Sequence, residues 1–414
     1  MSWEPYLVRT SNMSEQAITA RPDRHPAWPG SRRKLVGSLI ANIPCGVLTV
    51  VLPDGDAVRH QGTEPGPEAV LVLHRWRAIA RLLLGADNGF ATAFVDGDWS
   101  SPDLVSLLEL AARNLSCIPG ATGGSAPVRL FHRLLHLMRA NTRAGSRRNI
   151  IAHYDLGNDF YAHWLDSGMN YSSALYTQPG MTLEMAQAAK QALVLEMLGS
   201  PSGNRVLEIG CGWGDLAARL AEMGAQVTGI TLSPSQLSHA RARLGDRARL
   251  LLQDYRDTDE IFDQIVSIEM IEAVGEAYWP VYFDRLRKCL APGGVAVIQA
   301  ITIADEWLSS YRRAADFIQR YIFPGGMLPS PGEIARLSRE SGFVITRHHG
   351  FGASYALTLA EWRARFHEAW PHLAALGFES RFRRLWDYYL AYCEAGFRSG
   401  RIDVGLWRLE ARSC

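Results

Sequence analysis

Short apolar runs alternate with stretches of helical periodicity over most of the second half of the chain. The apolar runs predict strands at 206–209, 226–230, 248–252, 262–268 and 294–301. Helices are expected before and between them, at 183–198, 216–223 and 233–245, the last with Ser233 as its N-cap and Pro234 in its first turn. Alternation of this kind is typical of an α/β sheet with parallel strands.

The pattern before residue 126 is of a different kind. An apolar run at 46–52 ends in Pro-Asp-Gly-Asp and predicts a strand and a turn, and 69–73 predicts a second strand. An amphipathic helix is expected at 76–84, and a small-residue segment, 89–99, leads to a further helix from Ser101. We therefore expect a small α+β domain at 34–126, whose role is either packing or the presentation of lipid. Residues 1–33 are rich in Ser, Pro and Arg without periodicity, which predicts a flexible leader.

A basic amphipathic helix is expected at 127–149, between the small domain and a second domain at 150–414. Its apolar residues recur at helical spacing from Val128 to Met138, and Arg129, Arg133 and Arg139 lie among them. Such a helix can lie on an anionic membrane surface. It can equally pack between domains and leave a solvated basic edge.

A glycine-rich turn follows the strand at 206–209. Glu208 ends the apolar run, and Gly210, Gly212 and Gly214 occupy alternate positions before a helix. Glycines let a ligand lie against the backbone, and a helix N-terminus directs free N–H groups at it. The third glycine comes one position too early for the dinucleotide motif, and the second strand ends without an acid, so the spacing favours S-adenosylmethionine over NAD. A turn with a purely structural role is the alternative.

Composition excludes several classes of protein. The chain has 414 residues, 47% hydrophobic and 21% charged, with a formal net charge of +1. It is therefore expected to be globular, without nucleic acid as a partner. Six cysteines without a C-x-x-C pair indicate reduced thiols in the cytoplasm and predict neither a metal site nor disulfides. No signal peptide is apparent and no apolar run approaches the roughly 18 residues needed to cross a bilayer, so any membrane contact is expected to be peripheral.

Nine sequence blocks between residues 150 and 400 together carry a family resemblance. They are HYDLGNDFY (153–161), MNYSSALY (169–176), VLEIGCGWGDLA (206–217), GITLSPSQ (229–236), LQDYRD (252–257), FDQIVSIEMIEAVG (262–275), RYIFPGGMLPS (320–330), HGFGASYALTLAEW (349–362) and YYLAYCEAGFR (388–398). In this order they resemble the cyclopropane-fatty-acyl-phospholipid synthases and mycolic acid cyclopropane synthases. The resemblance implies a Rossmann-like class I methyltransferase sheet with helices on both faces. It also implies that S-adenosylmethionine methylates the cis double bond of an unsaturated phospholipid acyl chain, giving a cyclopropane.

The resemblance also assigns site residues by position. For the cofactor it implies Tyr171, Ser172, Glu208, Gly210, Gly212, Gly214, Thr231, Gln236, Asp254 and Tyr255. For a bicarbonate ion, which the family uses as its base, it implies Ser173, Glu272, Gln299, Tyr355 and the backbone of Ile301. Cys393 matches a family cysteine labelled as an active-site residue, although the mechanism needs no thiol and a helix cysteine is the simpler interpretation.

Two positions depart from the family and leave the product open. Ser173 stands where the family usually has Cys, and Gln299 where it usually has His. Glutamine cannot become cationic or relay a proton, so bicarbonate is expected to bind more weakly and the base can differ. Loss of a proton from the added methyl group closes a ring. Loss elsewhere, or after a hydride shift, gives a methyl- or methylene-branched chain instead.

The expected chemistry requires a dry site that stabilises positive charge. An alkene is a weak nucleophile and its methylated form is a carbocation, which a carboxylate such as Glu272 and the faces of Tyr176, Tyr321, Phe323 and Tyr355 would stabilise. The expected partners are unsaturated phospholipid acyl chains at the inner face of the membrane, and a homodimer stays open. Two other hypotheses remain: methylation of a soluble amine or hydroxyl compound, and a non-catalytic lipid carrier.

Overall fold

The computed structural model describes residues 29–115, 117, 156–313 and 315–412. The chain forms two compact units. The smaller unit contains residues 1–125 and 370–388, and the larger contains residues 126–369 and 389–414. The expected second domain, 150–414, therefore included residues 370–388, which belong to the N-terminal unit in the structure. The basic helix expected at 127–149 lies outside the described residues, as does the leader up to residue 28. Helix α1 (Pro29–Ile40) begins inside the expected leader, so its residues 29–33 are helical and not flexible coil.

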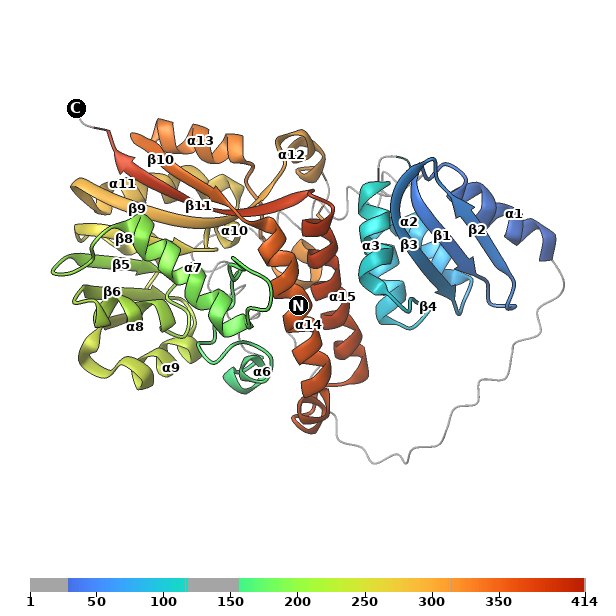
Figure 1. Cartoon of the computed structure of the whole chain (residues 1–414), viewed down its shortest axis with the longest axis horizontal. Helices are drawn as coiled ribbons and strands as arrows, with labels where there is room; N and C mark the ends of the chain where they lie inside the picture. The colour runs from blue at the N-terminus through green and yellow to red at the C-terminus, as the bar shows by residue number, and fades with distance from the viewer. Residues whose placement is uncertain (1–28, 116, 118–155, 314, 413–414) are drawn as a thin grey trace. The chain divides into compact units, whose positions relative to one another are not determined.

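The larger unit, residues 126–369 and 389–414, is built on a seven-stranded sheet in the order β10-β11-β9-β8-β5-β6-β7 (Figure 1). Its strands are β5 (Arg205–Ile209), β6 (Gln226–Thr231), β7 (Arg249–Leu252), β8 (Phe262–Ile268), β9 (Leu290–Ile303), β10 (Phe343–Gly350) and β11 (Ile402–Ala411). Strands β5 to β9 pair in parallel, whereas β11 lies antiparallel between β9 and β10. The five strands expected from the apolar runs are all present, and the Rossmann-like fold class is confirmed.

Helices cover both faces of this sheet, with α7 in front of the strands and α11 behind them in Figure 1. The helices of four or more residues are α6 (Asn158–Ala162), α7 (Leu183–Leu198), α8 (Asp215–Glu222), α9 (Pro234–Leu244), α10 (Ile271–Val274), α11 (Trp279–Cys289), α12 (Asp305–Tyr311), η5 (Ile318–Ile322), α13 (Pro331–Glu340), α14 (Gly352–Ala375) and α15 (Ser380–Arg398). The expected cap of α9 is confirmed, because the Ser233 side chain accepts a hydrogen bond from the backbone N–H of Gln236. Leu207, Ile265 and Phe283, each 0% exposed, join the strands to α11 in the core.

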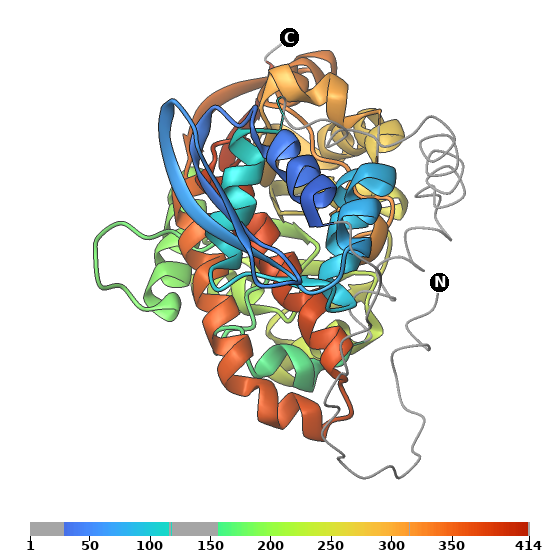
Figure 2. The ribbon, with the colours of Figure 1, turned by 90° about the vertical axis from the view of Figure 1, so that its right-hand side faces the viewer.

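The smaller unit contains a four-stranded sheet in the order β2-β1-β3-β4, which Figure 2 shows with α1 and α3 in view. Its strands are β1 (Cys45–Val51), β2 (Ala57–Gln61), β3 (Glu64–Leu73) and β4 (Trp99–Ser100), and its further helices are α2 (Arg77–Val95) and α3 (Leu104–Arg113). The expected break at Gly89 is wrong, because α2 continues through it. A Cβ on Gly89 would lie 2.0 Å from the carbonyl oxygen of Arg81. Residues eight apart in a straight helix are separated by about 12 Å, so α2 bends sharply.

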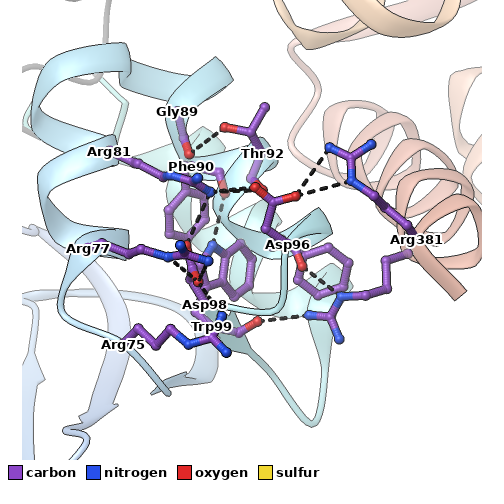
Figure 3. A network of polar contacts seen from close by, with 12 residues as sticks. Arg75, Arg77, Arg81, Gly89, Phe90, Thr92, Asp96, Asp98, Trp99 and Arg381 are labelled. Atoms are coloured by element: carbon purple, nitrogen blue, oxygen red, sulfur yellow. Dashed lines mark hydrogen bonds and ion pairs between the residues drawn. The ribbon is translucent and has the colours of Figure 1, made fainter. Parts of the chain in front are cut away.

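An arginine network surrounds a buried aspartate in the smaller unit (Figure 3). Asp98 is 0% exposed, and arginines 75, 77 and 81 lie within 3.2 Å of its carboxylate. Residues 370–388 complete this unit, because Arg381 pairs with Asp96 and Arg384 donates to the carbonyl oxygens of Phe94 and Trp99. Among the helices of the described residues, none is long and apolar enough to cross a membrane.

Candidate active site

The glycine turn connects β5 to α8 with three left-handed residues. The φ angles of Gly210, Gly212 and Gly214 are 81°, 52° and 86°, a region that side-chain-bearing residues rarely adopt. A Cβ added to Gly212 would meet no described atom within 4 Å, whereas one on Gly214 would lie 2.6 Å from Cδ1 of Leu244. Gly212 therefore presents bare backbone to open space, and Gly214 permits α8 to pack closely against α9.

The turn touches the loop that follows β8. A Cβ on Gly210 would lie 2.7 Å from Cγ of Met270, so glycine is required for this approach. Met270 is flanked by Glu269, at the end of β8, and by α10, which carries Glu272. The turn therefore contacts the segment of the chain that carries these two carboxyls.

Glu208, at the end of β5, has the features of a ligand-facing carboxyl. It is 4% exposed, and among the described residues its Oε2 has no hydrogen-bond partner. Burial raises its pKa to about 8, partly offset by the Lys190 ammonium. A buried polar atom without a partner is costly in a folded protein, and a polar ligand at the turn would remove that cost. The hydroxyl of Tyr255 is likewise buried without a partner in the described part of the chain.

Other residues expected at the cofactor already contact protein groups. Thr231 Oγ1 donates to Oε1 of Gln236 at 2.9 Å, which fixes the orientation of that amide. Asp254 forms a buried bidentate pair with the guanidinium of Arg256, at 2.8 and 2.6 Å. Its Oδ1 also accepts a hydrogen bond from the backbone N–H of Arg256 at 3.0 Å, so this carboxylate is held firmly in place. These residues lie at or just after the carboxyl ends of β6 and β7, the edge at which ligands bind in such sheets.

The segment before α7 brings Tyr171 to other aromatic residues and Ser172 to a buried lysine. The hydroxyl of Tyr171 is 2.8 Å from that of Tyr389, and its ring packs against Trp362 at 5.3 Å. Ser172 Oγ accepts a hydrogen bond from Nζ of Lys190, which is 3% exposed. Burial lowers the pKa of Lys190, and the nearby carboxylate of Glu269 opposes that shift. Lys190 was not expected at the site, because its position in α7 marks it only as a helix residue.

Three of the residues expected to hold bicarbonate converge instead on the carboxylate of Glu269. Its Oε1 accepts hydrogen bonds from the backbone N–H of Ser173 at 2.8 Å and from Nε2 of Gln299 at 2.6 Å. Its Oε2 accepts one from the hydroxyl of Tyr355 at 2.7 Å. Burial raises the pKa of Glu269, and these donors oppose the shift. The position of Glu269 after the parallel strand β8 predicts that it points toward the ligand crevice, but nothing in the sequence assigns it a specific role.

Glu269 occupies a strained backbone position. Its φ is +50°, one of only two positive values among the described non-glycine residues. A left-handed residue with a side chain costs about 1–2 kcal/mol. Such strain persists where surrounding contacts over-determine it, as the three hydrogen bonds to this carboxylate do.

Glu272 forms the second carboxyl of the site. Its Oε1 accepts a hydrogen bond from the backbone N–H of Ile301 at 2.5 Å, and its Oε2 is buried without a partner in the described residues. Burial raises its pKa to about 8, and the charge of Glu269 adds to the shift. Serine, glutamine, tyrosine and the Ile301 amide therefore all donate to protein carboxylates. The residues present do not fit a bicarbonate ion held by the same donors, and the expectation of that ion is corrected accordingly.

Cys393 lies beside the tyrosines of the site but in its protonated form. Burial raises the pKa of its thiol far above neutral pH, and the charge of Asp316 adds to the effect. A thiolate nucleophile is thus disfavoured. Of the expected aromatic residues, Tyr355 packs against Phe397 at 4.5 Å and Phe323 against Tyr389 at 6.2 Å. Tyr321 packs on Phe317, and Tyr176 is half-buried, with its backbone N–H donating to Ser354. No cluster of potential metal ligands occurs within the described ranges.

Sequence comparison assigns the family. The sequence model described as mycolic acid cyclopropane synthetase matches residues 141–407, well over half of the chain. The chain belongs to this family. The tuberculostearic acid methyltransferase UfaA1 of Mycobacterium tuberculosis is 39% identical to it over 87% of each chain. The cyclopropane-fatty-acyl-phospholipid synthase of Escherichia coli is 41% identical over 62% of this chain and 65% of the relative.

Solved structures of the family agree with the fold and the cofactor. The cyclopropane synthase MmaA2 from Mycobacterium tuberculosis superposes with a TM-score of 0.60 at 33% identity, covering 64% of this chain and 98% of that one. The mycolic acid cyclopropane synthase CmaA1, solved in complex with SAH and CTAB, gives 0.60 at 32% identity over the same shares. The expected family, the enzyme class and S-adenosylmethionine as cofactor are confirmed. The chain is an S-adenosylmethionine-dependent methyltransferase of lipid acyl chains.

Proposed function

We propose that this enzyme transfers a methyl group from S-adenosylmethionine to the cis double bond of an unsaturated acyl chain in a phospholipid. The observation that carries the proposal is the contact between the glycine turn and the loop of Glu269, Met270 and Glu272. It sets buried carboxyls beside the position at which the cofactor would lie. S-adenosylmethionine supplies an electrophilic methyl group, and an alkene that accepts it becomes a carbocation.

The described residues suit such a cation. The carboxylate of Glu269 supplies negative charge, and in a buried site that charge acts more strongly than in water. The rings of Tyr355 and Phe397, 4.5 Å apart, add polarisable aromatic surface close to Glu269. The half-buried, protonated thiol of Cys393 does not compete with the alkene for the methyl group.

The product is either the cyclopropane that the family resemblance implies or a methylene-branched chain. Both form from one cation by loss of one proton, so neither requires a reductant. A saturated methyl branch would require a hydride donor from a second reaction. Two observations support the branched product: Gln299 replaces the usual histidine, and the relative that matches 87% of this chain is named for tuberculostearic acid.

We place the acceptor at a membrane surface on the inner, cytoplasmic face, with peripheral association and without nucleic-acid partners. A second copy of the chain as a homodimer is part of the same proposal. Support comes from the sequence of 127–149, where arginines alternate with apolar residues, and from the relative of Escherichia coli that is named for phospholipids. Methylation of a soluble compound and a non-catalytic carrier role are the alternatives that the test below separates.

The test is a methyl-transfer assay with labelled S-adenosylmethionine and vesicles of phosphatidylglycerol carrying oleoyl chains. We expect label in the lipid, and mass spectrometry with chain fragmentation locates the added carbon and distinguishes ring from branch. Free oleate and a water-soluble amine serve as alternative acceptors. Label in the amine alone, or none in any acceptor, would contradict the proposal.

A further inference from the structure

We propose that the carboxylate of Glu269 is the base of this reaction and replaces the bicarbonate ion used by the family. The inference rests on the proposed function. It follows from the three donors, Ser173 N–H, Gln299 Nε2 and Tyr355 hydroxyl, that hold this carboxylate between 2.6 and 2.8 Å. A carboxylate and bicarbonate present the same planar pair of anionic oxygens. One protein side chain therefore satisfies donors that an exchangeable ion would otherwise occupy.

The hydrogen bonds identify the oxygen that takes the proton. Oε1 accepts from two donors, which uses both of its lone pairs, whereas Oε2 accepts only from Tyr355 in the described structure. The free lone pair of Oε2 therefore receives the proton. The C–H bond of the methylated cation breaks, and its electron pair forms either the ring C–C bond or a C=C bond. Glu269 returns the proton to water after the product leaves, so no further reactant is consumed.

The charges around Glu269 suit a base. Lys190 is a buried cation that stabilises its ionised form, while the nearby Glu272 resists carrying a second negative charge. Glu272 then stays largely protonated while Glu269 is ionised, because two adjacent carboxyls in a buried site do not readily ionise together. The replacement of the family's usual histidine by Gln299 is consistent with this role of Glu269. Glutamine donates a hydrogen bond to Glu269 and, unlike histidine, cannot take the proton from it.

The experiment compares the whole protein with Glu269→Gln and Glu269→Gly in buffers stripped of carbon dioxide and then supplemented with sodium bicarbonate. We expect wild-type methyl transfer to change less than twofold on removal of bicarbonate. Glu269→Gln should lose about 10²- to 10⁴-fold in rate, the usual contribution of a general base, while still binding S-adenosylmethionine by calorimetry. Glu269→Gly leaves the space of the carboxylate empty. Added bicarbonate should then raise the methyl-transfer rate of this variant at least tenfold. Glu340→Gln, an exposed acid on α13, is the matched control.

The outcomes are distinct. Wild-type activity that disappears without bicarbonate and returns with it would overturn the inference, as would full activity in Glu269→Gln. Failure of the wild type on every lipid acceptor would instead remove the proposed function, and with it this assignment. Direct binding measured with ¹³C-labelled bicarbonate gives a second readout: we expect it in Glu269→Gly and not in the wild type.

Discussion

At the scale of single residues, the site is defined by carboxyls that lie in the protein interior and form no direct ion pair among the described residues. Glu208 and Glu272 each have an oxygen without a partner in the described residues, and Glu269 has three neutral donors. Desolvation raises all three pKa values because it penalises the charged form. Proteins retain such costly groups chiefly where they act on a ligand.

The raised pKa values predict that stability falls as the pH rises from about 5 to 8. Burial raises the pKa of both Glu208 and Glu272 from 4.5 to about 8, so in this window the folded chain holds protons that the unfolded chain has released. Unfolding then releases protons, and each group lowers the free energy of unfolding by up to about 1.4 kcal/mol per pH unit. The stabilisation by Glu208 and Glu272 is fully present below pH 4.5, their pKa in the unfolded chain, and is lost as the pH rises through about 8, their pKa in the folded chain.

Thermal unfolding of wild type and Glu272→Gln between pH 5 and 9 checks this prediction. The variant keeps the acceptor for the Ile301 N–H and cannot ionise, so its midpoint should fall less steeply with pH. The comparison cancels every group the two proteins share. Equal slopes of the unfolding midpoint against pH in the two proteins would show that the pKa of Glu272 is not raised in the folded state. Glu340→Gln is the control and should match the wild type at every pH.

The residues of the site could be predicted only in part. Those in sequence blocks, such as Gly212 and Glu272, were available from spacing and resemblance. Glu269 also lies in such a block, at the end of β8, but its role could not be predicted. Its carboxylate is where Ser173, Gln299 and Tyr355 meet, and these residues come from distant parts of the chain. Lys190 was missed for the same reason. Tertiary contacts create these environments, and no local pattern records them.

At the scale of elements, the turn from β5 to α8 separates two uses of glycine. Gly214 is needed for packing, because Leu244 occupies the space of its Cβ, whereas Gly212 faces no described atom. We predict that Gly212→Ala weakens binding of S-adenosylmethionine at least about tenfold, because the added methyl group would enter the cofactor's space. The left-handed backbone should also reduce stability by about 1–2 kcal/mol.

Gly203→Ala provides the matched control for that substitution. Its φ is +75°, and an added Cβ would also meet nothing within 4 Å, but it precedes β5 and lies outside the turn. It should show the same loss of stability and unchanged affinity by calorimetry. Equal affinities in the two variants would mean that the cofactor does not lie against Gly212.

Strands with strong local signals were predicted and those without were not. Apolar runs identified β5 to β9 because parallel strands are buried on both faces. In β10 only Phe343 is fully buried and most other residues are exposed, so no apolar run marks it. The place of β11 between β9 and β10 is a long-range pairing, and sequence pattern cannot supply it.

At the scale of the whole molecule, the smaller unit depends on a segment from far along the chain. Arg384 donates to Phe94 and Trp99, Arg381 pairs with Asp96, and the Tyr388 ring packs on Phe94 at 5.5 Å. We predict that a fragment of residues 1–125 does not fold stably, because it lacks these partners. Joining residues 370–388 to it through a flexible linker should restore cooperative unfolding.

Circular dichroism melting curves and the chemical-shift dispersion of the amide protons distinguish the fragment of residues 1–125 from its joined version. A scrambled 370–388 segment of the same composition is the control for added mass and charge. Cooperative unfolding of the fragment alone at the midpoint of the joined version would contradict the prediction.

The position of β11 also constrains the order in which the protein can form on the ribosome. Among the described strands, β10 pairs only with β11, and β11 is synthesised about fifty residues later. During translation β10 therefore waits with its backbone unpaired while α14 and α15 emerge. A nascent chain stalled before residue 402 would expose the edge of β9 to other polypeptides, and chaperones that shield strand edges would be needed for that interval.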